Sequence, residues 1–238
     1  FLKDLSHKEL NVLSKDITNY IVDITSKQGG HLSSNLGVID ATIALCRVFD
    51  FSKDKIVFDV GHQCYAYKIL TGRSLERLRD KDGVSGFQKV CESPYDHFEC
   101  GHSSTSISVA NGFALARDYS KEKYDVIAFI GDSSIVNGLA MEGLNNASKN
   151  HKMIIVLNDN GMAISQPIGG LSKMFRRFST SNFYRKSKHF YQKITRWCKP
   201  LYSFGYKTKN WFKRHLIKMG LFDSLGYSVI GPIDGHDI

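Results

Sequence analysis

Apolar side chains recur at helical spacing in the first fifty residues of the chain. Leucine and isoleucine positions predict one helix from Leu5 to about Lys27 and another from about Leu36 to Phe49. Gly29-Gly30 interrupts the pattern, and the polar residues 31–35 predict a loop between the two helices. The N-terminal region is therefore expected to be helical.

Three short apolar runs later in the chain predict strands instead. They are Lys55–Val60, Asp125–Ile130 and Met153–Leu157, and the last two are almost uninterrupted, as is typical of parallel strands buried on both faces. Helices are predicted between them, at about 103–117 and 137–149. Strands that alternate with helices predict a doubly wound α/β fold with a mostly parallel sheet flanked by helices.

Composition excludes several classes of protein. Hydrophobic residues make up 42% of the 238 positions and charged residues 23%, a balance that a disordered or fibrous chain does not have. The apolar runs are far too short to cross a bilayer, so we expect no membrane partner. Five cysteines without a C-x-x-C pair favour reduced thiols and a cytoplasmic location. Because the chain begins with Phe1 rather than Met, we expect an N-terminal piece to be absent.

The net charge of +9 comes from one basic segment. The 46 residues of Lys173–Lys218 hold 14 lysines and arginines, 12 aromatic residues and no acidic residue, whereas the rest of the chain carries −5. Such a segment could bind single-stranded nucleic acid or an anionic membrane surface. Without an RNA-binding motif, we favour an excursion whose aromatic side chains are half-buried, and we expect no nucleic-acid partner. The predicted organisation is an α/β domain over 1–172, a basic insertion over 173–220 and a return to the α/β domain over 221–238.

Polar residues follow each predicted strand, and ligands of doubly wound folds lie beyond these carboxyl ends. His62 follows the first strand, Asp132 the second, and Asn160 the third, 28 residues beyond Asp132. A carboxylate and an amide oxygen on neighbouring strands suit Mg²⁺, which binds few protein groups together with substrate phosphates. Gly131 would let the backbone approach a phosphate, and the helix that starts near Ser103 would offer N–H groups to the same anion. The sequence therefore predicts a magnesium and diphosphate site.

Gly131-Asp132 followed by Asn160 resembles the thiamine-diphosphate motif, whose usual form is G-D-G and, later in the chain, N. Longer motifs resemble those of the 1-deoxy-D-xylulose-5-phosphate synthase family. They occur in the family's order over nearly the whole chain. These motifs are Gly29-Gly30-His31-Leu32-Ser33-Ser34-Asn35-Leu36-Gly37, Asp59-Val60-Gly61-His62-Gln63, Lys81-Asp82-Gly83, Ser85-Gly86-Phe87, Gly101-His102-Ser103-Ser104-Thr105-Ser106, Leu144-Asn145-Asn146-Ala147, Leu157-Asn158-Asp159-Asn160 and Gly231-Pro232-Ile233-Asp234-Gly235-His236-Asp237. The motifs around His31 and His62 favour a resemblance to the synthases over one to transketolases in general.

The resemblance implies a thiamine-diphosphate-dependent transferase that condenses pyruvate with glyceraldehyde 3-phosphate, with loss of CO₂. His31 and His62 would be catalytic, shuttling protons or hydrogen-bonding the substrate. Mg²⁺ would be held by Asp132, Asn160 and the main-chain carbonyl of Met162. The residues that would bind the cofactor are His62, Gly101, His102, Ser103, Asp132, Ser133, Ser134 and Asn160.

The chain departs from the family pattern in three places. Ser133 stands where the motif has its second glycine, and a side chain is unfavourable there if the position needs a positive φ. Gly161 and Ala163 replace a glutamate and a serine that are usual in the family. Members of the family also continue for several hundred residues past the Gly231–Asp237 motif. That part includes a pyrimidine-binding domain, which carries the glutamate that protonates the aminopyrimidine of the cofactor.

We therefore expect the N-terminal, diphosphate-binding part of such an enzyme. It should be inactive alone, with a homodimer as the assembly of the complete enzyme and a separate C-terminal half as a further partner. Two alternatives stay open. One is the N-terminal subunit of a split transketolase-like enzyme, and the other is a degenerate domain that binds RNA or an anionic surface through Lys173–Lys218.

Overall fold

The computed structural model describes residues 2–147, 151–159, 170, 220–231 and 233–238. The chain forms two compact units, Phe1–Ile164 with Ile233–Ile238, and Ser165–Pro232. The basic segment Lys173–Lys218 lies outside the described residues, and the domain boundaries at 172 and 220 stay predictions. The described elements are η1 (Leu2–Asp4), α1 (His7–Gln28), α2 (Leu32–Leu36), α3 (Ile39–Val48), β1 (Lys55–Phe58), α4 (Tyr65–Leu70), α5 (Ser106–Ser120), β2 (Val126–Gly131), α6 (Asp132–Ile135), α7 (Gly138–Ala147), β3 (Ile154–Asn158) and, in the second unit, α11 (Gly220–Ser224).

Helix α1 begins at a capping box and ends at a glycine. The Ser6 hydroxyl accepts from the backbone N–H of Glu9, and the Glu9 carboxylate accepts from the backbone N–H of Ser6. Gly29, at φ 73°, ends the helix in a conformation that glycine adopts most readily. One face of the helix is buried, as the apolar spacing predicted; its residues are Leu10, Ile17, Ile21, Ile24 and Thr25.

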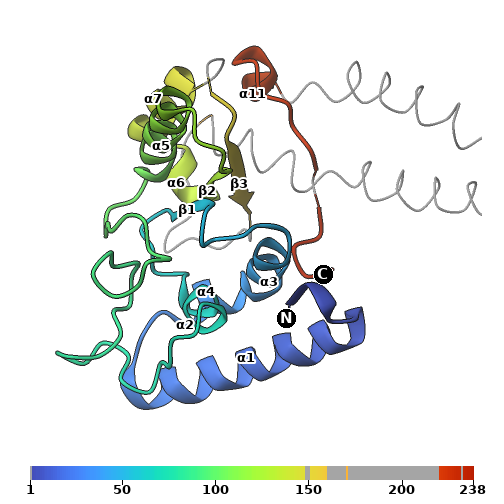
Figure 1. Cartoon of the computed structure of the whole chain (residues 1–238), viewed down its shortest axis with the longest axis vertical. Helices are drawn as coiled ribbons and strands as arrows, with labels where there is room; N and C mark the ends of the chain where they lie inside the picture. Colours follow the sequence, from blue (N-terminus) through green and yellow to red (C-terminus); the bar gives the residue numbers. More distant parts are fainter. Residues whose placement is uncertain (1, 148–150, 160–169, 171–219, 232) are drawn as a thin grey trace, which may run out of the picture. The chain divides into compact units, whose positions relative to one another are not determined.

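The three strands form one parallel sheet in the order β1-β2-β3. Alternate residues of β1 and β2, among them Ile56 and Phe129, pack into the core shared with α1, α3 and α4. Helix α5 packs on β1 and β2 and against α7, on the opposite side of the sheet in Figure 1. The predicted parallel α/β arrangement with helices on both faces is confirmed.

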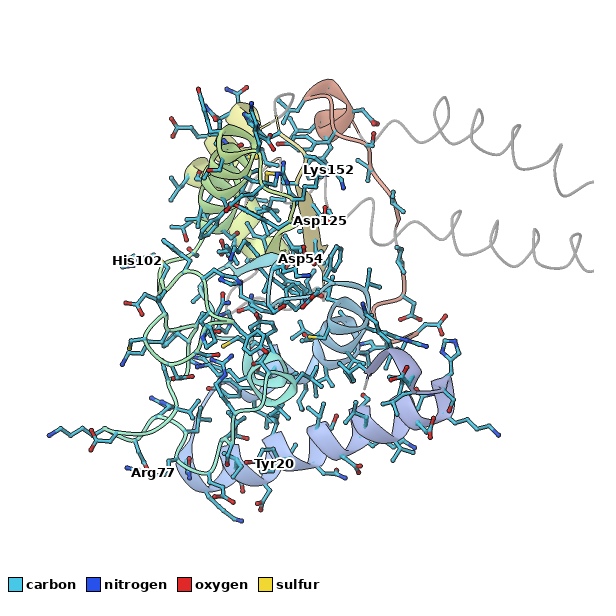
Figure 2. The ribbon with its side chains drawn as sticks, viewed as in Figure 1. Tyr20, Asp54, Arg77, His102, Asp125 and Lys152 are labelled. Atoms are coloured by element: carbon cyan, nitrogen blue, oxygen red, sulfur yellow. The ribbon has the colours of Figure 1, made fainter. Side chains whose placement is uncertain are left out.

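Polar contacts join the amino ends of the strands. Asp54, before β1, accepts a hydrogen bond from the backbone N–H of Asp125, before β2 (2.7 Å). The Asp125 carboxylate in turn accepts from Lys152 Nζ, before β3 (2.9 Å), and all three residues lie in one row in Figure 2. The residues predicted to be functional lie at the opposite, carboxyl edge of the sheet.

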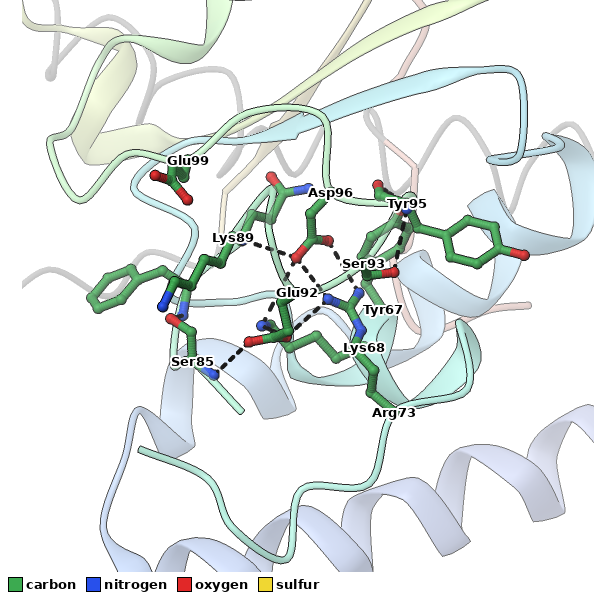
Figure 3. A network of polar contacts seen from close by, with 12 residues as sticks. Tyr67, Lys68, Arg73, Ser85, Lys89, Glu92, Ser93, Tyr95, Asp96 and Glu99 are labelled. Carbon is green, nitrogen blue, oxygen red and sulfur yellow. Dashed lines mark hydrogen bonds and ion pairs between the residues drawn. The ribbon is translucent and has the colours of Figure 1, made fainter. Parts of the chain in front are cut away.

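A buried ion cluster orders the loop between α4 and α5 (Figure 3). Lys68, fully buried on α4, pairs with Glu92, and Arg73 Nη1 lies 2.6 Å from Asp96 Oδ2 and 3.0 Å from Glu92 Oε1. The carboxylates also accept backbone hydrogen bonds of the same loop, Glu92 from Ser85 (2.7 Å) and Asp96 from Lys89 (2.9 Å). The cluster therefore fixes the loop segment that carries the Ser85-Gly86-Phe87 motif.

The structure corrects two expectations. The predicted loop at 31–35 is wrong, since α2 turns through Leu32–Leu36, and α4 was not predicted at all. Helix α4 is buried on every side over Tyr65, Ala66, Tyr67 and Lys68, so its residues show no polar face. The remaining predicted helices and strands are present, with ends shifted by a few residues.

Replacing Asp96 with Asn should lower the free energy of unfolding by about 3–5 kcal/mol, because it leaves Lys68 and Arg73 with an incomplete set of buried counter-charges. Urea unfolding followed by circular dichroism measures the change. The matched control is Lys27→Ala, which removes the exposed Lys27–Asp23 pair and should cost about 0.5 kcal/mol or less. Equal losses in the two variants would contradict a structural role for the cluster.

Candidate active site

Two histidines from distant parts of the chain meet beyond the carboxyl end of β1. His31 follows α1, His62 follows β1, and their ring centroids lie 5.2 Å apart in an edge-to-face arrangement. The Phe87 ring contacts His31 from the neighbouring loop, at 5.7 Å between centroids. The structure thus brings together the two residues that the sequence predicted as catalytic.

The surroundings favour the neutral form of both imidazoles. Desolvation lowers the pKa of His31, and the charge of Arg79 lowers it further. Desolvation also lowers the pKa of His62, aided by His31 and opposed by the carboxylate of Asp59. Within the part of the chain that the structure describes, the buried Nδ1 atom of His62 has no hydrogen-bond partner. A neutral pair can both accept and donate protons.

The buried carboxylate of Asp59 joins the end of β1 to the start of α5. Asp59 is 1% exposed, and it accepts from the backbone N–H groups of Ser104 (2.8 Å) and Ser106 (3.2 Å) and from the Ser106 hydroxyl (2.8 Å). It therefore acts as the helix cap, although it lies far from α5 in the sequence. Two of the N–H groups expected to face a diphosphate are occupied by this side chain.

Strained backbone flanks the Asp59 contact on both sides. Val60, the next residue, has φ 63°, and Ser104, which donates to Asp59, has φ 75°. A positive φ is unusual for any residue with a side chain and most unfavourable for a β-branched one. Strain of this kind persists where surrounding contacts enforce it, and it clusters at functional sites.

Asp132 lies at the carboxyl end of β2, beside the end of β3. Gly131 pairs with Asn158 in the β2–β3 register, which confirms that the two predicted strands are neighbours. Desolvation raises the pKa of the Asp132 carboxyl, and the negative charge of Asp159 raises it further. A partly buried carboxylate that lies in the field of a second negative charge suits a bound cation.

Ser133 and Ser134 lie in the short helix α6, directly after Asp132. Ser133 is not among the residues with positive φ, so the departure from glycine costs no backbone strain here. Its N–H donates to the Asp132 carboxylate (2.9 Å). The carbonyl of Ser134 accepts from the hydroxyl of Ser104 (2.9 Å), which also accepts from Asn137 Nδ2 (2.8 Å) and so ties this turn to the Asp59 contact.

The remaining predicted cofactor contacts lie in the exposed loop before α5. Gly101, His102 and Ser103 are exposed, and His102 lies on the outer side of this loop in Figure 2. Among the described residues, no atom lies within 4 Å of a side chain built at Gly101 or at Gly131, so none of these residues fills the space beside the backbone at either glycine. That space is compatible with a phosphate approaching the backbone.

Two of the three predicted metal ligands follow β3 in the chain. Asn160 and Met162 lie outside the described residues, as does Gly161. Among the residues that are described, no cluster of three or more acidic, histidine or cysteine side chains could hold a metal. Nor does any described helix combine the length and apolar character needed to cross a membrane.

Sequence reasoning missed the residues that support this site. Asn35 and Asp59 stand inside the quoted motifs, but apart from His31 the hydrogen-bond partners of their side chains are distant in sequence. Gln88 pairs with the edge of β1, where its amide accepts from Phe58 N–H (2.9 Å) and donates to the Ile56 carbonyl (3.3 Å). It thereby holds the adjacent Phe87 beside His31.

The chain is similar in sequence to known proteins over its whole length. Curated relatives named 1-deoxy-D-xylulose-5-phosphate synthase are 47% identical over 243 residues in Clostridium beijerinckii and 46% identical over 244 residues in Clostridium tetani and in Carboxydothermus hydrogenoformans. Each alignment covers 100% of this chain and 39–40% of the relative. The chain thus spans about two fifths of the length of the curated relatives it matches.

Solved structures show the same fold. A transketolase from Leishmania mexicana aligns with a TM-score of 0.56 at 19% identity, covering 65% of this chain and 28% of its own. A transketolase variant from Pichia stipitis aligns with a TM-score of 0.53 at 20% identity, covering 67% and 28%. The family match extends over residues 1–238, and the chain therefore belongs to the 1-deoxy-D-xylulose-5-phosphate synthase family.

Proposed function

We propose that the protein condenses pyruvate with glyceraldehyde 3-phosphate to 1-deoxy-D-xylulose 5-phosphate with loss of CO₂, using thiamine diphosphate and Mg²⁺. In this proposal the chain is the part that binds the diphosphate and contributes two histidines to the reaction. The family match over residues 1–238 carries the proposal. The approach of His31 to His62 supports it independently. A homodimeric assembly stays a prediction from the family resemblance, and a cytoplasmic location stays a prediction from the cysteine content.

The described residues fit thiamine diphosphate and a cation. No described residue fills the space beside Gly101 and Gly131, and the Asp132 carboxylate lies in the field of Asp159. His62 keeps a buried ring nitrogen that no described group satisfies. In this arrangement Asp132, with Asn160 and the Met162 carbonyl, would hold the cation, and residues 101–103 with 133–134 would line the diphosphate. When bound, thiamine diphosphate would supply the nucleophilic carbon and electron sink that decarboxylation of a 2-oxo acid requires.

The histidine pair would handle protons beside the reacting atoms. Because both imidazoles are held neutral, either can accept a proton from a hydroxyl and later return it, or donate a hydrogen bond to a carbonyl oxygen. The edge-to-face contact fixes the direction of each ring relative to the other. The Phe87 ring lies edge-to-face against His31, which is itself exposed, and restricts the orientation of the His31 ring.

Replacing His62 with Gln should weaken the dependence of stability on pH. The pKa of His62 is lower in the folded chain than its ordinary value of 6.5, so the unfolded chain takes up the proton first. The stability associated with neutral His62 is therefore present above pH 6.5 and lost as the pH falls below it. Urea unfolding at pH 7.5 and about pH 5.5 should show a smaller loss in His62→Gln than in the wild type. His7→Gln, exposed at the start of α1, is the control, and the same loss in the wild type and His62→Gln would contradict the prediction.

Removing the Asp132 carboxylate should weaken metal-dependent cofactor binding. Calorimetric titration should show Mg²⁺-dependent binding of thiamine diphosphate to the wild type, weakened roughly 10–100-fold or more in Asp132→Ala. Asp132→Asn keeps an acceptor for Ser133 N–H and removes the repulsion with Asp159, so it should bind as poorly while melting no lower than the metal-free wild type. Undiminished binding in both variants would exclude Asp132 as the metal ligand.

The reaction itself is tested by reconstitution. We expect the chain alone to leave pyruvate unchanged, because the resemblance places the group that protonates the cofactor in the part of the relatives that this chain does not cover. Adding the C-terminal part of the Clostridium beijerinckii relative should restore CO₂ release, and His31→Gln should reduce it by about 100-fold or more. A reconstituted enzyme that turns over ketose phosphates instead of pyruvate would favour a transketolase-like activity.

A further inference from the structure

The spacing of His31 and His62 is set by backbone segments that are not continuous with each other. His31 follows two glycines at φ 73° and 140°, and His62 follows Gly61 at φ 89°. These glycines let the chain turn sharply, but they do not hold either histidine at a fixed distance from the other. The edge-to-face ring contact needs a separate restraint on both segments.

Asn35 contacts both segments at once. Its Nδ2 donates to the carbonyl oxygen of His31 (2.6 Å) and to the carbonyl oxygen of His62 (2.8 Å). Its Oδ1 accepts from the backbone N–H of Tyr65 (2.9 Å), at the start of α4. The side chain is fully buried, so water does not compete for these three bonds.

The chemistry of the three contacts selects asparagine. The position needs two donors directed at two carbonyls and one acceptor directed at an N–H, and a carboxamide supplies all of them. Aspartate has the same shape but would place an oxygen against both carbonyls. Serine has a single hydroxyl donor and could hold only one of them. Tyr65 adds a weaker restraint through its hydroxyl, which accepts from the His31 N–H (3.3 Å).

We propose that Asn35 is the positioning residue that sets the distance between His31 and His62. Its two donor bonds clamp the carbonyl groups of the very residues whose rings form the pair. Displacing either carbonyl would move the attached ring away from its partner. The effect on turnover rests on the function proposed above, whereas the effect on the distance between the rings does not.

The test measures the ring distance directly. In the 238-residue chain labelled with ¹³C-histidine, the wild type should show a nuclear Overhauser effect between the two imidazoles, with the signals assigned from His31→Gln and His62→Gln. Asn35→Asp should lose this effect while the thermal melt still shows a folded chain. In the reconstituted enzyme the same variant should lower kcat by about 10–100-fold and change KM for pyruvate by no more than about threefold.

Two further variants keep the result decisive. Asn111→Asp is the matched control, since Asn111 is also buried and donates through Nδ2 (2.8 Å to Asn146 Oδ1), but on α5 and away from both histidines. It should keep the effect between the rings. If Asn35→Asp does not fold, Asn35→Ser replaces it, because one hydroxyl can clamp only one carbonyl.

An inter-ring effect that persists in the folded Asn35 variant, or that disappears equally in Asn111→Asp, would overturn the proposal. Absence of the effect in the wild type would also overturn it. If Asn35→Asp loses the effect and the reconstituted enzyme keeps full turnover, Asn35 still positions the rings and the catalytic role proposed for the histidines fails instead.

Discussion

The carboxylate of Asp59 is the contact on which the geometry of this site depends. It is buried at the end of β1, and three hydrogen bonds from Ser104 and Ser106 satisfy it there. A buried charge is tolerated only with such partners, and removing them would leave it very unfavourable. The charge therefore forces the start of α5 against the end of β1. The positive φ angles of Val60 and Ser104, which cost of order 1–3 kcal/mol each, are the strain that this contact has to offset.

Much of the fold could be predicted from the apolar pattern because a buried parallel strand differs so clearly from its surroundings. The almost uninterrupted run that predicted a strand at Asp125–Ile130 forms β2, Val126–Gly131, the central strand of the sheet. The apolar pattern does not predict a helix that is buried on every side, because such a helix has no polar face to alternate with the apolar one. Helix α4 hides the ammonium group of Lys68 among carboxylates of a loop that is distant in sequence, so a lysine that would normally mark a surface lies in the core. Helix α2 was missed for a related reason, since Asn35 turns its amide back to the carbonyl of His31 instead of disrupting the helix.

The site shows the same division. Position at a strand end was enough to select His62 and Asp132, because topology alone brings the carboxyl ends of parallel strands to one edge. The residues that orient them could not be selected in this way. Asp59 acts on serines 45 and 47 positions away, and Asn35 acts on Tyr65, 30 positions away. Hydrogen bonding between residues so far apart in the sequence depends on how the loops are arranged in the folded chain. No local pattern of apolar and polar residues predicts that arrangement.

One residue connects the histidine half of the site to the carboxylate half. Ser104 donates its N–H to Asp59, next to the strand end that leads to His62, and its hydroxyl to the carbonyl of Ser134, in the turn that starts at Asp132. A continuous series of hydrogen bonds therefore runs from β1 to α6 through a residue that is itself strained. Such a connection ties the strand end that leads to His62 to the turn that starts at Asp132 before any ligand arrives. Preorganisation of this kind reduces the reorganisation that a reaction would otherwise require, which gives a physical reason for strain to be concentrated at this edge of the sheet.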